Sequence, residues 1–258
     1  MFILLVGVYF YIIRGELAKK AWADFHNSTV ALFFDTDDAG FAMNIGNYYF
    51  NGTIGGGEYN PDLAQKAYKK AVSINPKILW GHYQLSRIAF VKGDYERALE
   101  EIKKELEANP QNLRSLYVRG LVYGYRNKSG DLELAENDFR RFTYWAPSEW
   151  AGYNDLAWIL FKEGKYAEAE MELGRAFENI QVADKNPWLL NALGVARLNL
   201  GNKSGAGEAF LNALAEAEKL TANEWRASYP GNNPLSAEDG LKKFLETLKE
   251  NIWRAKGA

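Results

Sequence analysis

A pattern of paired helices recurs five times in this 258-residue chain, and it constrains the fold more than any other feature. In each copy, small and large apolar residues return at matching helical positions, and Gly or Pro marks the turns. A period of roughly 34 to 40 residues is typical of a solenoid, in which each repeat packs only on its neighbours. The sequence therefore predicts an all-α array, a design that creates long binding surfaces more readily than catalytic pockets.

Three kinds of position carry the pattern. Gly93, Gly164 and Gly201 supply the tight turn between the two helices of a repeat. Pro residues end the second helix, because Pro cannot continue it; they are Pro76, Pro110 and Pro147. Small residues on the first helix let the second approach closely, and an aromatic residue fills the remaining gap. The small positions include Gly46, Gly120 and Gly194, and the aromatic ones Tyr68, Phe139 and Phe210.

Together these positions resemble the tetratricopeptide repeat (TPR) family over roughly residues 37–220. The resemblance implies repeats at about 35–78, 79–112, 113–149, 150–186 and 187–220, after an N-terminal part (1–34). Residues 221–258 are expected to form a loop and a capping helix that starts at Ser236. In this family the first helix of each repeat lines a concave face. Applied to this sequence, the same first-helix positions imply a partner-binding groove. Its residues are Trp80, Tyr83, Arg87, Phe90, Arg114, Tyr117, Tyr125, Asn154, Trp158, Trp188 and Asn191, with Leu121 and Phe161. Packing of some of these rings between repeats is the alternative.

An apolar run at the start of the chain is the second informative feature. As a helix its 13 residues rise about 20 Å, which is short of the roughly 30 Å hydrocarbon core of a bilayer. No charge precedes the run, and no small-residue cleavage pattern follows it, so it differs from a signal peptide. It resembles the N-terminal helix of type IV pilin-like subunits, but Leu5 replaces the glutamate of that pattern. We expect an assembly or membrane segment of Phe2, Ile3, Leu4, Leu5, Val6, Val8, Tyr9, Phe10, Tyr11, Ile12 and Ile13, followed by a linking helix over residues 16–34.

Composition and motifs argue against several functions. The chain has no Cys, a net charge of −2 and no basic stripe, which removes thiol chemistry and disfavours nucleic-acid binding. Its two histidines, His26 and His82, have no carboxylate at a ligand-like helical spacing. Residues 35–40 begin like a calcium loop but lack later ligands, so their acids are expected to cap a helix. We predict no catalytic residue, no cofactor and no metal site.

Four Asn-x-Ser/Thr sequons occur, at Asn27, Asn51, Asn127 and Asn202. The last three fall in predicted turns between the helices of a repeat, along one edge of the array. Such placement favours glycans on an exposed, extracellular surface, although Asn and Ser are also good turn formers.

The sequence thus predicts a non-catalytic protein-interaction scaffold at the cell surface. We expect its apolar start to mediate self-assembly into a filament, with other copies of the chain as partners. The alternative is a membrane-anchored adaptor of the cell envelope that holds another protein in its groove.

Overall fold

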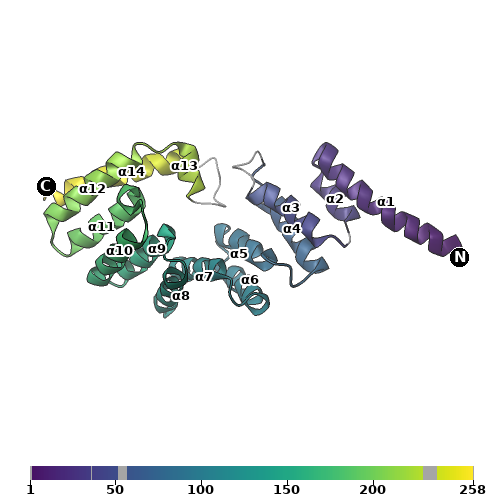
Figure 1. The fold of residues 1–258 in the computed structure, drawn as a ribbon, viewed down its shortest axis with the longest axis horizontal. Helices are drawn as coiled ribbons and strands as arrows, with labels where there is room; N and C mark the ends of the chain where they lie inside the picture. The colour runs from purple at the N-terminus through teal and green to yellow at the C-terminus, as the bar shows by residue number, and fades with distance from the viewer. Residues whose placement is uncertain (1, 36, 52–56, 229–236, 258) are drawn as a thin grey trace. The chain divides into compact units, whose positions relative to one another are not determined.

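The computed structural model describes residues 2–35, 37–51, 57–228 and 237–257, and only the backbone of residues 2–12. Over this part of the chain the fold is all-α, with no strand. The chain divides into two compact units, Met1–Pro110 (unit 1) and Gln111–Ala258 (unit 2). Figure 1 shows the helices of each unit as antiparallel pairs that follow one another along the chain.

Unit 1 begins with two helices that lie outside the repeat pattern and continues with two repeat-like pairs. Contacts join α1 to α2, α3 to α4, and α5 to α6, and α4 also packs against α5. The helices span Phe2–Phe25 (α1), Ser28–Phe34 (α2), Ala39–Phe50 (α3), Pro61–Ile74 (α4), Gly81–Val91 (α5) and Tyr95–Ala108 (α6).

Unit 2 contains three pairs and a C-terminal cover. Contacts join α7 to α8, α9 to α10, and α11 to α12, and α14 packs on α12 as the predicted capping helix would. The helices span Leu113–Arg126 (α7), Asp131–Trp145 (α8), Trp150–Lys162 (α9), Tyr166–Asn179 (α10), Pro187–Asn199 (α11), Lys203–Ala217 (α12), Ala222–Ala227 (α13) and Ala237–Ala255 (α14), with a 3-10 turn at Ala183–Lys185. The all-α helical-repeat fold is confirmed.

Close approach of paired helices depends on a glycine that faces an aromatic ring. A Cβ built on Gly194 would overlap the ring of Phe210, which is fully buried. The same overlap would occur between Gly46 and Tyr68. Larger residues at these glycines would force the helices apart, so small and aromatic positions pack as the sequence predicts.

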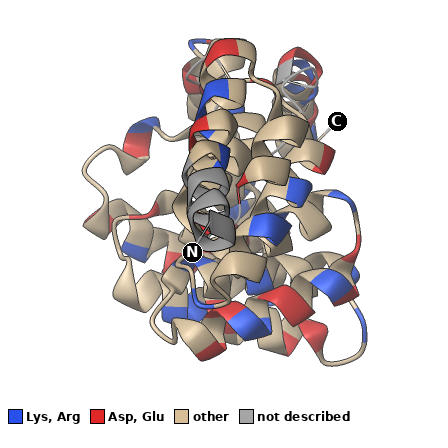
Figure 2. Cartoon of the chain, turned by 90° about the vertical axis from the view of Figure 1, so that its right-hand side faces the viewer, with Lys and Arg blue, Asp and Glu red and all other residues tan. Residues whose placement is uncertain are grey.

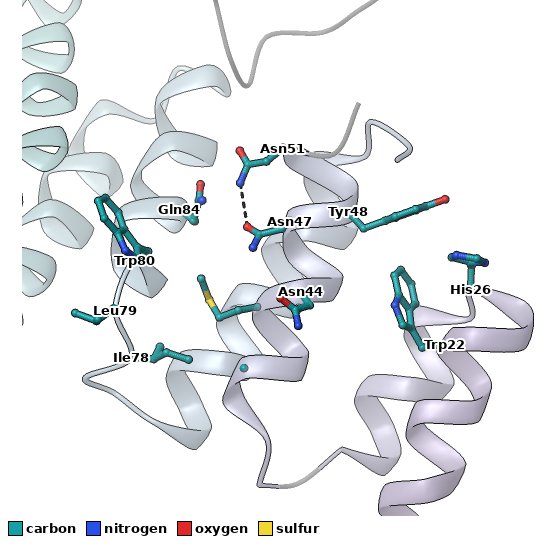
Figure 3. Close-up of a pocket in the computed structure, with 12 residues that line it drawn as sticks. Trp22, His26, Asn44, Asn47, Tyr48, Asn51, Ile78, Leu79, Trp80 and Gln84 are labelled. Atoms are coloured by element: carbon teal, nitrogen blue, oxygen red, sulfur yellow. Dashed lines mark hydrogen bonds between the residues drawn. The ribbon is translucent and has the colours of Figure 1, made fainter. Parts of the chain in front are cut away.

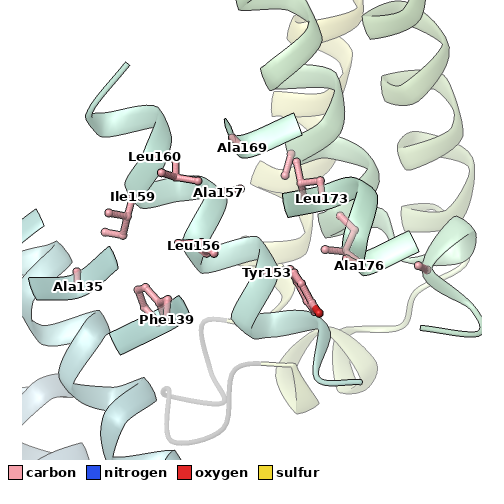
Figure 4. Close-up of a cluster of buried hydrophobic side chains, with 13 residues drawn as sticks. Ala135, Phe139, Tyr153, Leu156, Ala157, Ile159, Leu160, Ala169, Leu173 and Ala176 are labelled. Atoms are coloured by element: carbon pink, nitrogen blue, oxygen red, sulfur yellow. The ribbon is translucent and has the colours of Figure 1, made fainter. Parts of the chain in front are cut away.

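The core of unit 2 follows from the same positions. Figure 4 shows Phe139 of α8, Leu156 and Leu160 of α9, and Leu173 of α10 in one buried cluster. In the second repeat-like pair Ser86 takes the place of the usual glycine. Its hydroxyl is buried and donates to the carbonyl of Tyr83 at 2.7 Å, so this polar group is satisfied inside its own helix.

Helix ends are set by the residues that the sequence indicates. Gly93, Gly164 and Gly201 adopt φ of +75°, +73° and +83°, the left-handed region that favours glycine in the turn after a helix. Asp38 caps α3 by accepting from the backbone N–H of Phe41 at 2.8 Å, and Asp35 accepts from the backbone N–H of Asp38 at 3.0 Å. The expected N-cap at Ser236 lies outside the described residues.

Two elements differ from the sequence interpretation. The apolar run and the first part of the linking segment form one continuous helix, α1, because no Pro interrupts it and an isolated glycine such as Gly15 is tolerated. The rest of the linking segment forms α2 after a bend at residues 26–27. The segment after Leu220 was expected to be a loop, yet it contains α13. Thr221 and Glu224 form a capping box there, the side chain of each bonding to the backbone N–H of the other.

The charged residues are mixed in sign. On the face turned to the viewer in Figure 2, Lys and Arg alternate with Asp and Glu along the helices. Within the described residues, no helix combines the length and the apolarity that crossing a bilayer requires.

Candidate functional site

Most of the predicted groove residues of unit 2 come together around one cavity of about 340 Å³, which we name the unit 2 groove. Three successive first helices, α7, α9 and α11, supply its walls, and α14 adds Phe244. Its lining residues are Leu121, Tyr125, Asn154, Asp155, Trp158, Phe161, Trp188, Asn191, Ala192, Val195 and Phe244.

One acidic group in this groove was not predicted. Asp155 accepts a hydrogen bond from the Tyr117 hydroxyl and another from the Asn154 amide, the latter at 3.0 Å. Burial raises the pKa of Asp155 to about 6, although these two hydrogen bonds act to lower it. The groove therefore carries a carboxylate whose charge changes in mildly acidic solution.

Two exposed or half-buried rings form the open part of the wall. Tyr125 is 56 % exposed, and its ring lies 5.0 Å from that of Trp158. A Cβ on Gly124 would collide with the Trp158 ring, so this glycine makes room for it. Lys162 covers the other side: its ammonium lies 4.7 Å from the Trp158 ring centre and donates to the Gly124 carbonyl at 2.7 Å. Trp158 is thus held in one orientation.

Trp188 has a more structural place than the sequence predicts. Its ring is only 8 % exposed and stacks on Trp150 at 4.9 Å and on Trp225 at 5.5 Å. It forms the floor of the groove rather than a free contact surface. Asn191 is also anchored, since its Oδ1 accepts from Asn251 of α14 at 3.1 Å.

Two other predicted residues of unit 2 do not line the cavity. Arg114 is exposed and lies 3.6 Å from the carboxylate of Glu149. Tyr117 packs its ring on Phe139 and Phe142 while its hydroxyl holds Asp155. Tyr117 therefore positions a groove residue instead of facing a partner.

In unit 1, Trp80 lines a cavity, and the other three predicted groove residues are absent from its lining. Tyr83 is 9 % exposed, and Phe90 packs its ring near Tyr95. Arg87 lies over the Phe50 ring and donates to Asn51 at 2.7 Å and to Gln84 at 2.8 Å. These three residues contact neighbouring side chains instead of lining that cavity.

That cavity, of about 810 Å³, is largely formed by residues that were not predicted, and we name it the unit 1 groove. Its lining residues are Trp22, His26, Gly40, Met43, Asn44, Asn47, Tyr48, Asn51, Ile78, Leu79, Trp80 and Gln84. Figure 3 shows the asparagines along α3, with Trp80 and Gln84 on one side and Trp22 and His26 on the other. None of these lining residues is Asp, Glu, Lys or Arg.

Trp80 has a backbone conformation that bulky residues rarely adopt. Its φ of +70° lies in the left-handed region, at a cost of roughly 1–2 kcal/mol. As the N-cap of α5 it offers no side-chain cap, and buried Glu105 of α6 takes that role. The Glu105 carboxylate accepts from the N–H groups of Trp80 at 3.3 Å and Tyr83 at 3.1 Å. It also accepts from the Asn109 amide at 2.8 Å. Helix α6 therefore holds the strained residue in place.

His82 differs from the sequence interpretation because it does meet a carboxylate. Its Nδ1 lies 2.6 Å from Glu101 of α6, a contact between two helices that helical spacing alone does not reveal. Burial acts to raise the pKa of Glu101, but the His82 hydrogen bond and the Arg97 and Lys104 charges hold it below its usual value. The pair lines neither groove. Among the described residues, no group of three or more His, Asp or Glu is placed to hold a metal ion.

The sequons differ in accessibility. Asn127 and Asn202 are exposed at helix ends, and Asn27 is exposed as the cap of α2. Asn51 is half-buried, and its amide nitrogen donates to Asn47 at 2.9 Å and to Tyr68 at 3.3 Å. A glycan replaces one of the two hydrogens on this nitrogen and would displace at least one of these bonds, so the folded geometry disfavours attachment at Asn51.

The N-terminal assembly residues lie mostly outside what the structure describes. The side chains of Phe2, Ile3, Leu4, Leu5, Val6, Val8, Tyr9, Phe10, Tyr11 and Ile12 are not described, and Ile13 is half-buried in α1. Their role stays a prediction.

Comparisons with known proteins agree with the fold. The family model described as tetratricopeptide repeat matches residues 127–185. The structure of YrrB, a TPR protein with an unusual peptide-binding site, is 19 % identical, with a TM-score of 0.55 over 74 % of this chain and 93 % of that one. A tetratricopeptide repeat protein from Parabacteroides merdae is 19 % identical, with a TM-score of 0.57 over 93 % and 84 %. PilW, a type IV pilus biogenesis factor, is 14 % identical, with a TM-score of 0.59 over 85 % and 90 %. The matched repeats and these neighbours identify the fold as that of a tetratricopeptide repeat protein.

Proposed function

We propose that this chain is a non-catalytic scaffold that binds a segment of a partner protein in the unit 2 groove. One observation carries the proposal: Tyr125, Asn154, Trp158, Trp188 and Asn191, from three successive helices, line a single cavity. Aromatic area with a few directed amide groups is the composition that protein interfaces favour at their centres. The YrrB likeness adds a precedent, since that protein is described as having a peptide-binding site.

The chemistry of the groove indicates what its partner carries. Trp158 and Tyr125 offer flat apolar area, and the Asn154 amide, which lines the same cavity, can hydrogen-bond a peptide backbone. Asp155 adds a negative charge at neutral pH. The partner segment therefore combines an apolar or aromatic side chain with a nearby Lys or Arg.

Selection from a random peptide library tests the proposal. Peptides selected on the full chain are expected to bind the Trp158→Ala variant at least about tenfold more weakly, a loss typical of an interface hot spot. The control is Trp145→Ala, which removes a 65 % exposed ring of unit 2 that does not line the groove. Equal binding to all three proteins would show that the peptides bind elsewhere and would reject the groove as the site.

A second proposal concerns the location and assembly of the protein, and the sequence supports it. We propose that residues 2–13 mediate self-assembly into a filament at the cell surface, with membrane anchoring in the envelope as the alternative. The fold shared with PilW, described as a pilus biogenesis factor, is in keeping with an envelope setting. Removing residues 1–13 should abolish filaments in negative-stain images if the segment drives assembly. If it anchors the protein instead, removal should abolish flotation with lipid vesicles and leave particle size unchanged.

A further inference from the structure

We propose that the unit 1 groove binds a neutral carbohydrate chain, independently of the partner site in unit 2. The site differs in kind from the unit 2 groove, because amide groups and aromatic rings line it without any Asp, Glu, Lys or Arg. Its volume of about 810 Å³ falls within the range of small-molecule sites.

Hydrogen bonds behind the groove orient its amides. Asn47 accepts from the Tyr68 hydroxyl and from Asn51, both at 2.9 Å, so its oxygen is occupied on the inner side. Gln84 accepts from Arg87 at 2.8 Å. These bonds leave the NH₂ groups of Asn47 and Gln84 as donors, and no described residue accepts from either. Exposed Asn44, which lines the same groove, adds both a donor and an acceptor.

Aromatic rings stand on both sides of the asparagine row (Figure 3). On one side Trp22 meets Tyr48 and His26 edge to face, with ring centres 5.1 Å apart in both pairs. On the other side Trp80 is 42 % exposed. The C–H faces of a sugar ring pack on aromatic rings, and its hydroxyl groups both accept and donate hydrogen bonds, which matches this lining.

Backbone strain also occurs at the unit 1 groove. Over the described residues, three non-glycine residues have positive φ, and two of them, His26 and Trp80, line the unit 1 groove. His26 and Asn127 each follow the last residue of a helix, where a left-handed residue is common, so Trp80, at the start of α5, is the strained one. Residues held in rare conformations cluster at binding sites, and here Glu105 fixes the one that presents the exposed indole.

The lining also discriminates between ligands. A charged group entering the groove would lose hydration and find no opposite charge among the lining residues, so neutral sugars are favoured over acidic ones. A peptide could accept the same amide bonds. What favours a sugar chain is the presence of aromatic rings on both sides of the polar asparagine row.

Titration calorimetry on the full chain tests the proposal. The probes are neutral hexamers of glucose in α-1,4 and β-1,4 linkage, of mannose and of N-acetylglucosamine, with a galacturonate hexamer as the acidic comparison. We expect saturable binding of at least one neutral hexamer at millimolar concentration or below. No binding by any neutral hexamer, or tighter binding by galacturonate, would overturn the proposal.

The Trp80→Gly variant separates binding from folding. Glycine suits a φ of +70°, so the melting temperature should hold or rise, while sugar affinity falls at least about tenfold. Asn44→Ala, at an exposed position with no hydrogen bond to a described residue, should weaken binding several-fold. Unchanged affinity in both variants would contradict the site.

Trp158→Ala serves as the matched control in unit 2. It should bind the sugar as the unaltered chain does, because Trp158 lines the other groove. Loss of sugar binding in Trp158→Ala alone would assign the sugar to unit 2 and overturn the proposal for unit 1. Peptide binding in unit 2 is measured separately, so failure of one proposal leaves the other standing.

Discussion

The two grooves of this molecule are lined by different chemistry, and the difference follows from how regular the surrounding structure is. The unit 2 groove lies across three consecutive repeat helices, and Asp155 gives it a titratable charge. The unit 1 groove lies where α3 faces α1, a helix outside the repeat pattern, and it carries no charged lining residue. Regular repeats thus build a surface that positional analogy can find, whereas a helix outside the repeat pattern adds groove residues, such as Trp22, that analogy does not reach.

The largest expected effect tests the repeat packing that supports the unit 2 groove. Phe210→Ala removes a fully buried ring that fills the space beside Gly194. The resulting cavity should lower the free energy of unfolding by about 3–5 kcal/mol, measured by urea denaturation. Leu211→Ala, next to it and 52 % exposed, is the control and should change stability by less than about 0.5 kcal/mol. Similar values for the two variants would refute a packing role for this ring.

The second test concerns the support of the unit 1 groove. Glu105→Ala leaves the N–H groups of Trp80 and Tyr83 without their acceptor and should cost about 2–3 kcal/mol in urea denaturation. The exposed neighbour Glu107 provides the control variant, Glu107→Ala, which should be nearly neutral. Sugar affinity in unit 1 should fall with Glu105→Ala, whereas peptide affinity in unit 2 should not. A parallel loss of both affinities would mean that the two grooves are not independent.

The third test uses pH to separate the charged groove from the uncharged one. Because the pKa of Asp155 is about 6 in the folded chain and lower when unfolded, the folded state binds more protons between about pH 4 and 6. The contribution of Asp155 to the free energy of unfolding is therefore favourable at low pH and is lost as the pH rises through 6.

Asp155→Asn should isolate this contribution. The free energy of unfolding of the variant should match that of the unaltered chain near pH 4 and exceed it at pH 7 by on the order of 1–2 kcal/mol. Thermal melting across that pH range measures the difference. Peptide binding in unit 2 should lose its pH dependence in the same variant, and sugar binding in unit 1 should not change. A constant stability difference at every pH would contradict the raised pKa.

The smallest effect is expected from a single hydroxyl. Tyr68→Phe removes the donor to Asn47 but keeps the ring beside Gly46, so stability should fall by only about 1 kcal/mol. The Asn47 amide would then be held by Asn51 alone, so its orientation should be less fixed and sugar affinity should decrease several-fold. Tyr153→Phe is a comparable change in unit 2, where the hydroxyl meets only Asn179 at 3.4 Å, and it should leave sugar affinity unchanged.

Much of the fold could be predicted because its determinants are local. Gly93 and Gly201, for example, both adopt the left-handed conformation in the turn after a helix, which glycine favours whatever the rest of the fold. The packing of Gly194 on Phe210 recurs between Gly120 and Phe139, so one repeat helps to predict another. The short helix α13 was missed because a capping box with one helical turn gives too little periodicity to detect.

The site residues were predicted less completely, because several of them come together from helices that lie far apart in the sequence. Extending the groove positions to the first repeat would have suggested Asn44, Asn47 and Asn51, which share one face of α3. Trp22 and His26 could not be found this way, since they belong to a helix with no counterpart in the other repeats. Glu105 and Asp155 act through contacts between helices, and a single sequence does not report such contacts.

The stack of indoles in unit 2 has an optical consequence. Trp150, Trp188 and Trp225 lie nearly parallel, at 22° and 28°, whereas Trp22 and Trp80 of unit 1 meet their ring neighbours at steep angles. The electronic transitions of chromophores 4.9 and 5.5 Å apart couple strongly, so this stack should give a paired band in circular dichroism. The molecule therefore contains its own spectroscopic label for α9, α11 and α13. Recording the loss of that signal during denaturation would show when unit 2 unfolds, without any added dye.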